Sequence, residues 1–450
     1  MHNSKAAWFR GIIFIIIFIL INNFLIFTLC PKGNYSRNTI REMYSEKENF
    51  DVVFAGSSYA IKGINPYIMD EELGVNTFDY SFSAQIYIGT YYSLKELFKY
   101  HKPKMIVLNT DLESYTRKKE YEMAYIPTVL YMKPSFNKVE FYLNSAAQDG
   151  SYLDRLFLWP AYHVKSLKEV ISNIKGKLDP KYINYPKQDQ LDEYKDKKDG
   201  YIGKGFVKVD ESNPKNVLND NTLGKMTPKA TDLNNIQENN VEYFKKIVDL
   251  CNENNTELVL LHTPLPTYRI LNEKNYFEFD KEISRIASEN GVDYYNYNLI
   301  KPEWFKSKTE YFQDYAHLNS LGSEVFSKSF AEFLKLRSSG EDMSKYFYTP
   351  EEYLNTINYI NNTWFTWKKN NDNITLIADS LYGNNVEPEY QFILIDSKTG
   401  KKEVIRDYDI NPKFTFKKPT LSKYKIRVNA REVGSNNEFT RYYEENFGEK

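Results

Sequence analysis

The clearest indication of the fold lies in one stretch near the start of the chain, Phe50-Asp51-Val52-Val53-Phe54-Ala55-Gly56-Ser57-Ser58. It begins as a short, largely apolar run and ends in a glycine and two serines. A short apolar run closed by small residues is typical of a buried parallel strand that leads into a tight turn. The stretch therefore predicts the first strand of an α/β domain, with Ser58 just beyond the strand's carboxyl end.

Helical and strand patterns alternate along the chain beyond this stretch. We expect helices over 86–100, 241–252, 277–290 and 318–336, and strands over 105–108, 257–262 and 292–295. Strands that alternate with helices of this length predict a doubly wound α/β fold, a parallel sheet covered on both faces. Ligands of such sheets bind beyond the carboxyl ends of the strands, which is where we expect Ser58.

The alternation stops between about 114 and 234, which we interpret as an insertion within an α/β domain of residues 50–340. After Gly340 the pattern changes to short strands of alternating polarity separated by turn sequences. These strands are expected over 374–378, 390–395, 413–416 and 424–430. They predict a small all-β sandwich domain over residues 350–450.

Residues 11–29 form an apolar stretch that only Asn22 and Asn23 interrupt. Its length matches the roughly 20 residues that a helix needs to cross a bilayer core. No small-residue cleavage pattern follows it, which favours an uncleaved anchor over a signal peptide. We expect a transmembrane helix within residues 1–30 and a juxtamembrane linker over 31–49. The chain would then be a single-pass protein of the cell membrane with its bulk outside the cytoplasm, although basic residues at both ends of the stretch leave its orientation open.

Composition argues against several classes of protein. The 59 Lys and Arg residues and the 60 Asp and Glu residues nearly cancel, and no basic cluster of the kind that binds nucleic acid is present. The two cysteines, Cys30 and Cys251, lie far apart and have no metal-site spacing. We therefore expect no nucleic-acid partner, no metal and no cofactor.

Two motifs carry possible chemistry: Ser58 after the first strand, and Asp314-Tyr315-Ala316-His317 before the last predicted helix. A serine hydroxyl becomes a nucleophile when a base takes its proton and an acceptor orients that base. Each motif alone also has an ordinary explanation, a helix cap or a polar turn. Their common placement at one sheet edge favours the catalytic interpretation. His262 ends another predicted strand at this edge, where a structural histidine is the favoured interpretation.

The Gly56-Ser57-Ser58 turn and the Asp314-x-x-His317 motif resemble the SGNH/GDSL hydrolase superfamily. Within it, the chain is most similar to the membrane-anchored branch of DltD-like proteins and exopolysaccharide acetyltransferases. The resemblance covers about residues 50–335 in outline, and only the two end motifs are specific. It implies Ser58 as nucleophile, His317 as base and Asp314 as the residue that orients it. Ser57, which replaces the family's usual aspartate, remains the alternative nucleophile.

The resemblance also implies donors for an oxyanion, which would be Ser81, Ser83 and Asn109 together with the backbone N–H of Ser58. The chain departs from the family pattern here. Residues 80–84 lack the family's glycine, and Asn109-Thr110-Asp111 differs from the usual Gly-x-Asn-Asp.

The function implied is that of a serine acyltransferase, which moves an acyl group, with acetyl favoured, onto a cell-surface polysaccharide or teichoic-acid-like polymer. In the anchored branch a polytopic membrane O-acyltransferase typically supplies the acyl group. Two alternatives remain open: an esterase that deacetylates the same glycans, and a non-catalytic glycan-binding or assembly protein.

Overall fold

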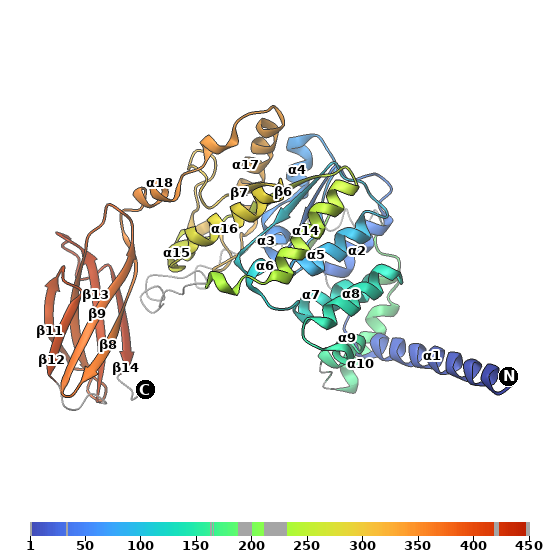
Figure 1. Cartoon of the computed structure of the whole chain (residues 1–450), viewed down its shortest axis with the longest axis horizontal. Coiled ribbons are helices and arrows are strands. Elements are labelled where there is room, and N and C mark those ends of the chain that lie inside the picture. The colour runs from blue at the N-terminus through green and yellow to red at the C-terminus, as the bar shows by residue number, and fades with distance from the viewer. Residues whose placement is uncertain are drawn as a thin grey trace. The chain divides into compact units, whose positions relative to one another are not determined.

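The computed structural model in Figure 1 describes residues 2–32, 35–162, 164, 166–187, 200–210, 232–417 and 423–446. The chain divides into two compact units. The first consists of Met1–Val209, Ile236–Leu260 and Asn290–Asp293, and the second of Asp210–Asn235, Leu261–Glu289 and Tyr294–Lys450.

A five-stranded parallel sheet lies at the centre of the α/β fold, with the order β2-β1-β3-β6-β7. Its strands are β1 (Val52–Ala55), β2 (Thr77–Asp79), β3 (Met105–Asn109), β6 (Glu257–His262) and β7 (Asp293–Asn296). Strand β1 pairs in parallel with both neighbours, so that Phe54 lies opposite Asp79 on one side and Val107 on the other. All four residues of β1 are buried, as expected for a strand covered on both faces. The predicted α/β class is confirmed.

Helices of the first unit pack around these strands. They include α2 (Tyr35–Ser45), α3 (Ser58–Gly63), α4 (Pro66–Leu73), α5 (Tyr87–Leu97) and α14 (Glu238–Glu253). Helices α5 and α14 contact each other, and the rings of Tyr87 and Phe244 lie 5.6 Å apart. Helix α2 falls inside the segment predicted as a linker, yet it buries Ile40 and Met43 in this unit.

The predicted insertion contains several short helices. These are α6 (Leu112–Thr116), α7 (Glu122–Tyr131), α8 (Phe136–Ala147), α9 (Tyr152–Leu156), η1 (Trp159–Tyr162), α10 (Leu167–Leu178), α11 (Pro180–Ile183) and η2 (Leu233–Asn235). A hairpin of β4 (Gly200–Gly203) and β5 (Phe206–Lys208) follows α11. The remainder of the predicted polar segment, residues 188–199 and 211–231, lies outside the described residues.

The N-terminal helix α1 (His2–Leu29) contains the predicted apolar stretch. Within the described residues it is the one helix long and apolar enough to cross a bilayer, over the 22 residues Trp8–Leu29. A helix of this kind is either a membrane anchor or a signal sequence.

The second unit contains α15 (Thr267–Asn272), α16 (Tyr276–Glu289), η3 (Thr309–Tyr311), α17 (Ser320–Ser338), η4 (Met343–Tyr346) and α18 (Pro350–Asn355). Two antiparallel sheets follow, with the orders β11-β10-β13-β14 and β12-β9-β8. Their strands are β8 (Ile360–Asn370), β9 (Asn373–Tyr382), β10 (Pro388–Asp396), β11 (Lys402–Asp409), β12 (Lys413–Lys417), β13 (Tyr424–Glu432) and β14 (Arg441–Asn446). Both sheets contribute to one core, which includes Leu376, Phe392 and Val428, so the predicted all-β region is confirmed.

Candidate functional site

Ser58 is the first residue of α3 and directly follows the turn at the end of β1. The turn depends on Gly56, whose φ is +131°, a backbone conformation that residues with a side chain rarely adopt. A Cβ at this position would also lie 2.8 Å from the carbonyl oxygen of Asn109. The glycine thus lets the end of β1 lie against the end of β3, and Ser58 emerges there half-buried.

Ser57 has different surroundings. Its side chain is buried, and its Oγ lies 3.3 Å from both Asn109 Oδ1 and Asp111 Oδ2. Asp111 also caps α6 by accepting the backbone N–H of Ser114 at 2.7 Å. A buried hydroxyl that donates to a structural carboxylate is a poor nucleophile, so accessibility favours Ser58 over Ser57 as the attacking group.

Asp314 and His317 form a compact pair in the turn before α17. The Nδ1 atom of His317 lies 3.0 Å from Asp314 Oδ2, and the backbone N–H of His317 donates to Asp314 Oδ1 at 2.8 Å. Ala316 donates a second backbone hydrogen bond to Oδ1, and Gln313 Nε2 donates to Oδ2. The carboxylate therefore organises the whole turn and orients the imidazole ring.

The charge on Asp314 is strongly favoured. Burial alone would raise the pKa of this carboxyl, but hydrogen bonds and the charge of His317 outweigh burial and hold the pKa well below its usual range. An ionised acceptor at Nδ1 leaves Nε2 as the nitrogen that can take a proton. The sequence prediction that these two residues converge agrees with this geometry.

The candidate residues are distributed over the two units. Ser57, Ser58 and Asn109 belong to the first unit, and Asp314 and His317 belong to the second. The structure brings together Asp314 with His317 and, separately, the serine turn with Asn109. That the Ser58 hydroxyl meets the His317 imidazole remains a prediction.

The proposed oxyanion donors Ser81 and Ser83 follow β2 and run beside the end of β1, since Phe82 donates its N–H to the Gly56 carbonyl at 3.1 Å. The Ser81 N–H donates to Asp79 Oδ1 at 3.0 Å, and the Ser83 N–H donates to the Tyr35 hydroxyl at 3.2 Å. Both backbone donors thus have other acceptors in this structure. Asn109 stays beside the serine turn through its hydrogen bond with Ser57.

Asp79 lies close to this turn, and the sequence analysis did not single it out. Its side chain is fully buried, and burial raises its pKa to about 8 despite hydrogen bonds from Ser81. The β4–β5 hairpin packs against it so closely that a Cβ on Gly205 would lie 1.7 Å from the Asp79 carbonyl oxygen. Asp79 ends β2, which is only three residues long and follows the polar residue Asn76, so no sequence pattern identifies it.

His262 ends β6 and is buried. Its carbonyl oxygen accepts the N–H of Tyr297 at 3.0 Å, and its ring centroid lies 6.0 Å from that of Tyr276. These contacts belong to packing within the second unit.

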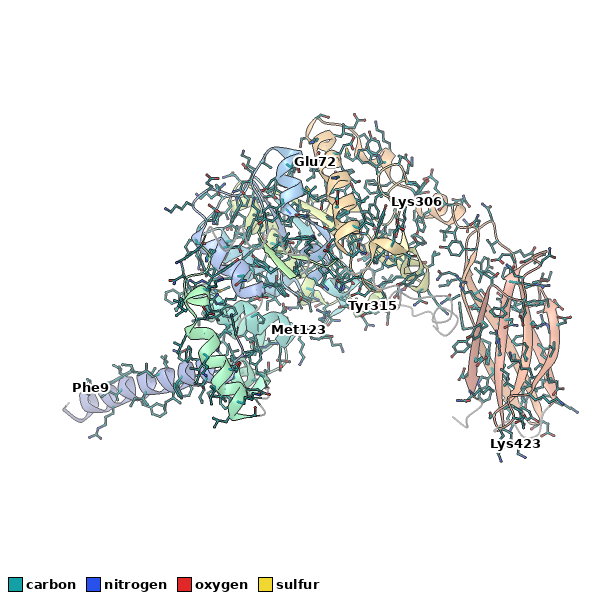
Figure 2. All side chains as sticks on the ribbon, turned by 180° about the vertical axis from the view of Figure 1, so that it is seen from behind. Phe9, Glu72, Met123, Lys306, Tyr315 and Lys423 are labelled. Carbon is teal, nitrogen blue, oxygen red and sulfur yellow. The ribbon has the colours of Figure 1, made fainter. Side chains whose placement is uncertain are left out.

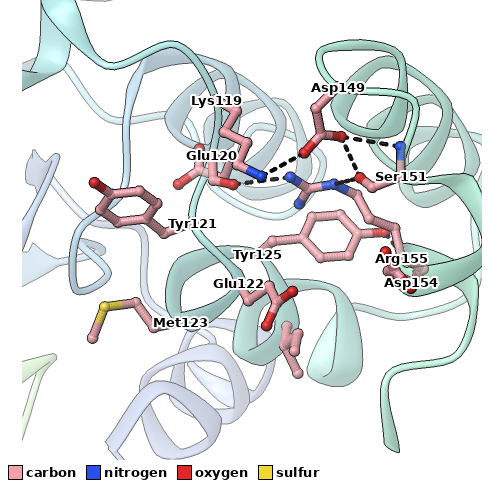
Figure 3. Close-up of a pocket in the computed structure, with 11 residues that line it drawn as sticks. Lys119, Glu120, Tyr121, Glu122, Met123, Tyr125, Asp149, Ser151, Asp154 and Arg155 are labelled. Atoms are coloured by element: carbon pink, nitrogen blue, oxygen red, sulfur yellow. Dashed lines mark hydrogen bonds and ion pairs between the residues drawn. The ribbon is translucent and has the colours of Figure 1, made fainter. Parts of the chain in front are cut away.

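A cavity of about 360 Å³ lies in the insertion of the first unit, and no predicted site residue lines it (Figure 3). Polar contacts join residues that line this cavity. Lys119 pairs with Asp149 at 2.8 Å, and Arg155 Nη2 donates to the Glu120 carbonyl oxygen at 2.9 Å. Glu120 is buried, its carboxylate accepts the N–H of Gly89, and burial raises its pKa to about 8. Among the described residues, no group of three or more His, Cys, Asp or Glu side chains could hold a metal ion.

No protein-family profile matches the sequence, and no curated protein matches it. Among solved structures, the chain is similar to a two-domain esterase active on acetylated mannans and co-crystallised with mannopentaose, with 10% identity and a TM-score of 0.29 over 95% of this chain and 99% of that one. It also matches an engineered protein (8% identity, TM-score 0.14, 90% of this chain and 96% of that one). A third match is β-glucosidase 3B from Thermotoga neapolitana in complex with glycerol (10%, 0.14, 90% and 76%). Similarities of this size do not establish a shared function.

Proposed function

We propose that this protein is a membrane-anchored serine enzyme of the SGNH type that cleaves acyl esters on cell-surface glycans. Ser58 is the nucleophile, His317 the base and Asp314 the residue that orients the base. The observation that carries the proposal is the Asp314–His317 pair, in which an ionised carboxylate contacts Nδ1 at 3.0 Å.

The chemistry proceeds in two steps. The Ser58 hydroxyl loses its proton to His317 Nε2 while its oxygen bonds to the ester carbonyl carbon, and the ester C–O bond then breaks. The imidazolium returns that proton to the departing sugar oxygen. In the second step a water molecule gives a proton to His317 and attacks the carbonyl carbon of the Ser58 ester. The bond to Ser58 then breaks, the imidazolium returns the proton to the serine oxygen, and the carboxylic acid leaves.

The negative charge on the ester oxygen needs donors at the turn. The Ser58 backbone N–H, at the beginning of α3, is the first candidate, and Asn109 lies beside the same turn through Ser57. One well-placed donor of this kind contributes on the order of 3 kcal/mol to the transition state. Ser81 and Ser83 would have to exchange their present acceptors to take part.

Helix α1 indicates where the substrate would be found, because it is long and apolar enough to span a membrane. If Trp8–Leu29 is retained as a span, it holds the α/β fold next to a membrane. We place the bulk of the chain on the extracytoplasmic side of that membrane. Acylated polymers of the cell envelope, including polysaccharides and teichoic-acid-like polymers, are the esters present there.

Transfer of the acyl group to a glycan hydroxyl is the second candidate function, because the retained anchor would place Ser58 near a polytopic membrane donor. The first step is then the same, and a sugar hydroxyl replaces water in the second. Water exclusion decides between the two outcomes.

Turnover of p-nitrophenyl acetate by the detergent-solubilised full chain tests the proposal. We expect activity in the wild type and its loss in Ser58→Ala and His317→Ala. Ser57→Ala tests the alternative nucleophile, and Ser284→Ala, an exposed serine of α16, is the matched control. Oligosaccharide acceptors added to the active chain separate acetate release from acetyl transfer.

Equal activity in Ser58→Ala and Ser284→Ala would refute the assignment of the nucleophile. Binding of acetylated oligosaccharides without any turnover by the wild type would instead support the non-catalytic glycan-binding alternative.

A further inference from the structure

We propose that Phe157, η1 and α10 of the insertion enter the lipid bilayer beside α1, and that α10 presents an apolar stripe to the lipid. The stripe consists of Leu167, Ile171 and Leu178. The inference rests on α1 being a retained membrane span, as in the proposed function, and is independent of the chemistry at Ser58.

Helix α1 is covered along one face only. The partly or fully shielded residues of its C-terminal half recur every three or four positions and are Phe18, Asn22, Leu25, Ile26, Thr28 and Leu29. This spacing defines a single helical face. On other faces Leu20 and Phe24 remain 63% and 64% exposed. Figures 1 and 2 show the base of α1 beside the insertion and the rest of the helix free of it.

The covered face extends far along the apolar span. The ring of Phe18 lies 5.7 Å from that of Phe157, which in turn lies 6.4 Å from that of Trp159. Phe18 precedes Leu29 by eleven residues, or ~16 Å of helix, while the span Trp8–Leu29 is ~33 Å long. If α1 crosses a bilayer, Phe157 and Trp159 therefore lie at the depth of the acyl chains.

Helix α10 has the pattern of a helix that lies at a membrane interface. None of its twelve residues is buried. Leu167, Ile171 and Leu178 are 74%, 44% and 57% exposed, and at 100° per residue they fall within about 40° of one another. Exposed Lys168 and Lys175 lie to one side of this stripe. An apolar stripe flanked by lysines is typical of helices that bury one face at the headgroup–acyl boundary.

Hydrogen bonds fix α10 to the end of α1. Lys177 Nζ donates to the carbonyl oxygens of Phe27 and Cys30 at 2.7 and 2.6 Å, and Asn173 Nδ2 donates to the Leu29 carbonyl at 3.3 Å. A cation and an amide there satisfy carbonyls that a helix end leaves unpaired. Because α10 cannot change depth independently of α1, insertion of α1 brings the stripe to the lipid.

The occupant of the stripe is lipid and not a second protein, because the stripe adjoins a helix whose uncovered faces are apolar over the length of a bilayer. The test is lipid exposure of single labelled cysteines in the full chain, reconstituted in vesicles of phosphatidylcholine and phosphatidylglycerol. Both native cysteines are buried, and the unsubstituted chain is the labelling blank.

Ile171→Cys reports on the stripe, Phe14→Cys on the exposed span of α1, and Lys245→Cys, an exposed position of α14 in the same unit, on the aqueous surface. Each carries an environment-sensitive fluorophore. We expect the labels at 171 and 14 to be quenched by nitroxide lipids and several-fold less by iodide than the label at 245.

Two results would overturn the inference while leaving the anchor intact. Both results assume that the label at position 14 lies in lipid. If iodide quenches the label at position 171 as strongly as the label at 245, the stripe faces water. If neither quencher reaches the label at 171, protein covers the stripe. A label at 14 that iodide quenches as strongly as at 245 would refute the anchor itself, and the inference with it.

Discussion

Asp314 is the residue on which the proposed chemistry depends most, after the nucleophile itself. Its carboxylate accepts hydrogen bonds from two backbone N–H groups, from Gln313 and from the ring of His317. It therefore both shapes the turn and selects the tautomer that carries the proton on Nδ1.

We expect Asp314→Asn to lower kcat for p-nitrophenyl acetate by about 10³- to 10⁴-fold with little change in KM, because an amide no longer holds the imidazole in the required tautomer. Gln313→Ala, which removes one hydrogen bond to the same carboxylate, is the matched control and should cost far less. Similar small losses in both variants would contradict the role assigned to Asp314.

Acid sensitivity at Asp314 follows from the direction of its pKa shift. Because the folded pKa lies below the unfolded value, this group stabilises the fold above about pH 4, and that stabilisation is lost as the pH falls further. Urea denaturation of the second unit should therefore be less acid-sensitive in Asp314→Asn. An unchanged acid dependence would mean that the carboxylate is not paired in the folded chain.

At the scale of elements, the β1–α3 turn sets the position of Ser58. Gly56→Ala places a Cβ 2.8 Å from the Asn109 carbonyl at a φ of +131°, whereas Gly74→Ala meets only a φ of +68° with nothing within 4 Å. We expect Gly56→Ala to cost about 2–4 kcal/mol and Gly74→Ala about 1 kcal/mol. Chemical denaturation measures both, and equal losses would refute the close approach of the β1 and β3 ends.

The strands differ in how clearly the sequence predicts them. Strands β1, β3, β6 and β7 were predictable because each is a short run ended by turn residues. Strand β2 is three residues long and carries no periodic signal. Strand β11 has no fully buried residue, which removes the alternation that identifies a strand. The sequence of helix α2 looks like a polar linker, because polar residues such as Glu42 are buried in this helix beside the apolar ones.

The residues in and around the candidate site also differ in how clearly the sequence indicates them. Ser58, Asp314 and His317 stay a predicted site, which rests on their residue types and their order along the chain. The contacts of Asp111 with Ser57, and of Asp79 with the β4–β5 hairpin, arise from tertiary packing between segments far apart in sequence. No local pattern encodes such contacts.

At the scale of the molecule, three buried carboxyl groups lower the stability of the first unit as the pH rises. Burial raises the pKa of Glu42 to about 7 and those of Asp79 and Glu120 to about 8. These groups keep their protons in the folded state at a pH where the unfolded chain has lost them. The folded state therefore binds more protons, and stability falls as the pH rises from about 4 to about 8.

We expect the Tm of the chain to decrease between about pH 4 and pH 8, and Glu120→Gln to reduce that decrease. The glutamine can still accept the Gly89 N–H but has no proton to lose. Glu122→Gln, an exposed neighbour, is the control and should leave the slope unchanged. A slope that Glu120→Gln leaves as steep as in the wild type would show that Glu120 is ionised in the folded chain.

The proposed chemistry requires Ser58 to be a nucleophile that His317 activates. The most direct measurement is peptide mass spectrometry of the full chain after reaction with a fluorophosphonate probe, for the wild type, Ser58→Ala, Ser57→Ala and His317→Ala. We expect one modified serine, Ser58, labelled in the wild type and in Ser57→Ala and unlabelled in the other two variants. Labelling at Ser57, labelling of Ser58 that persists in His317→Ala, or no labelling of the folded wild type would contradict this expectation.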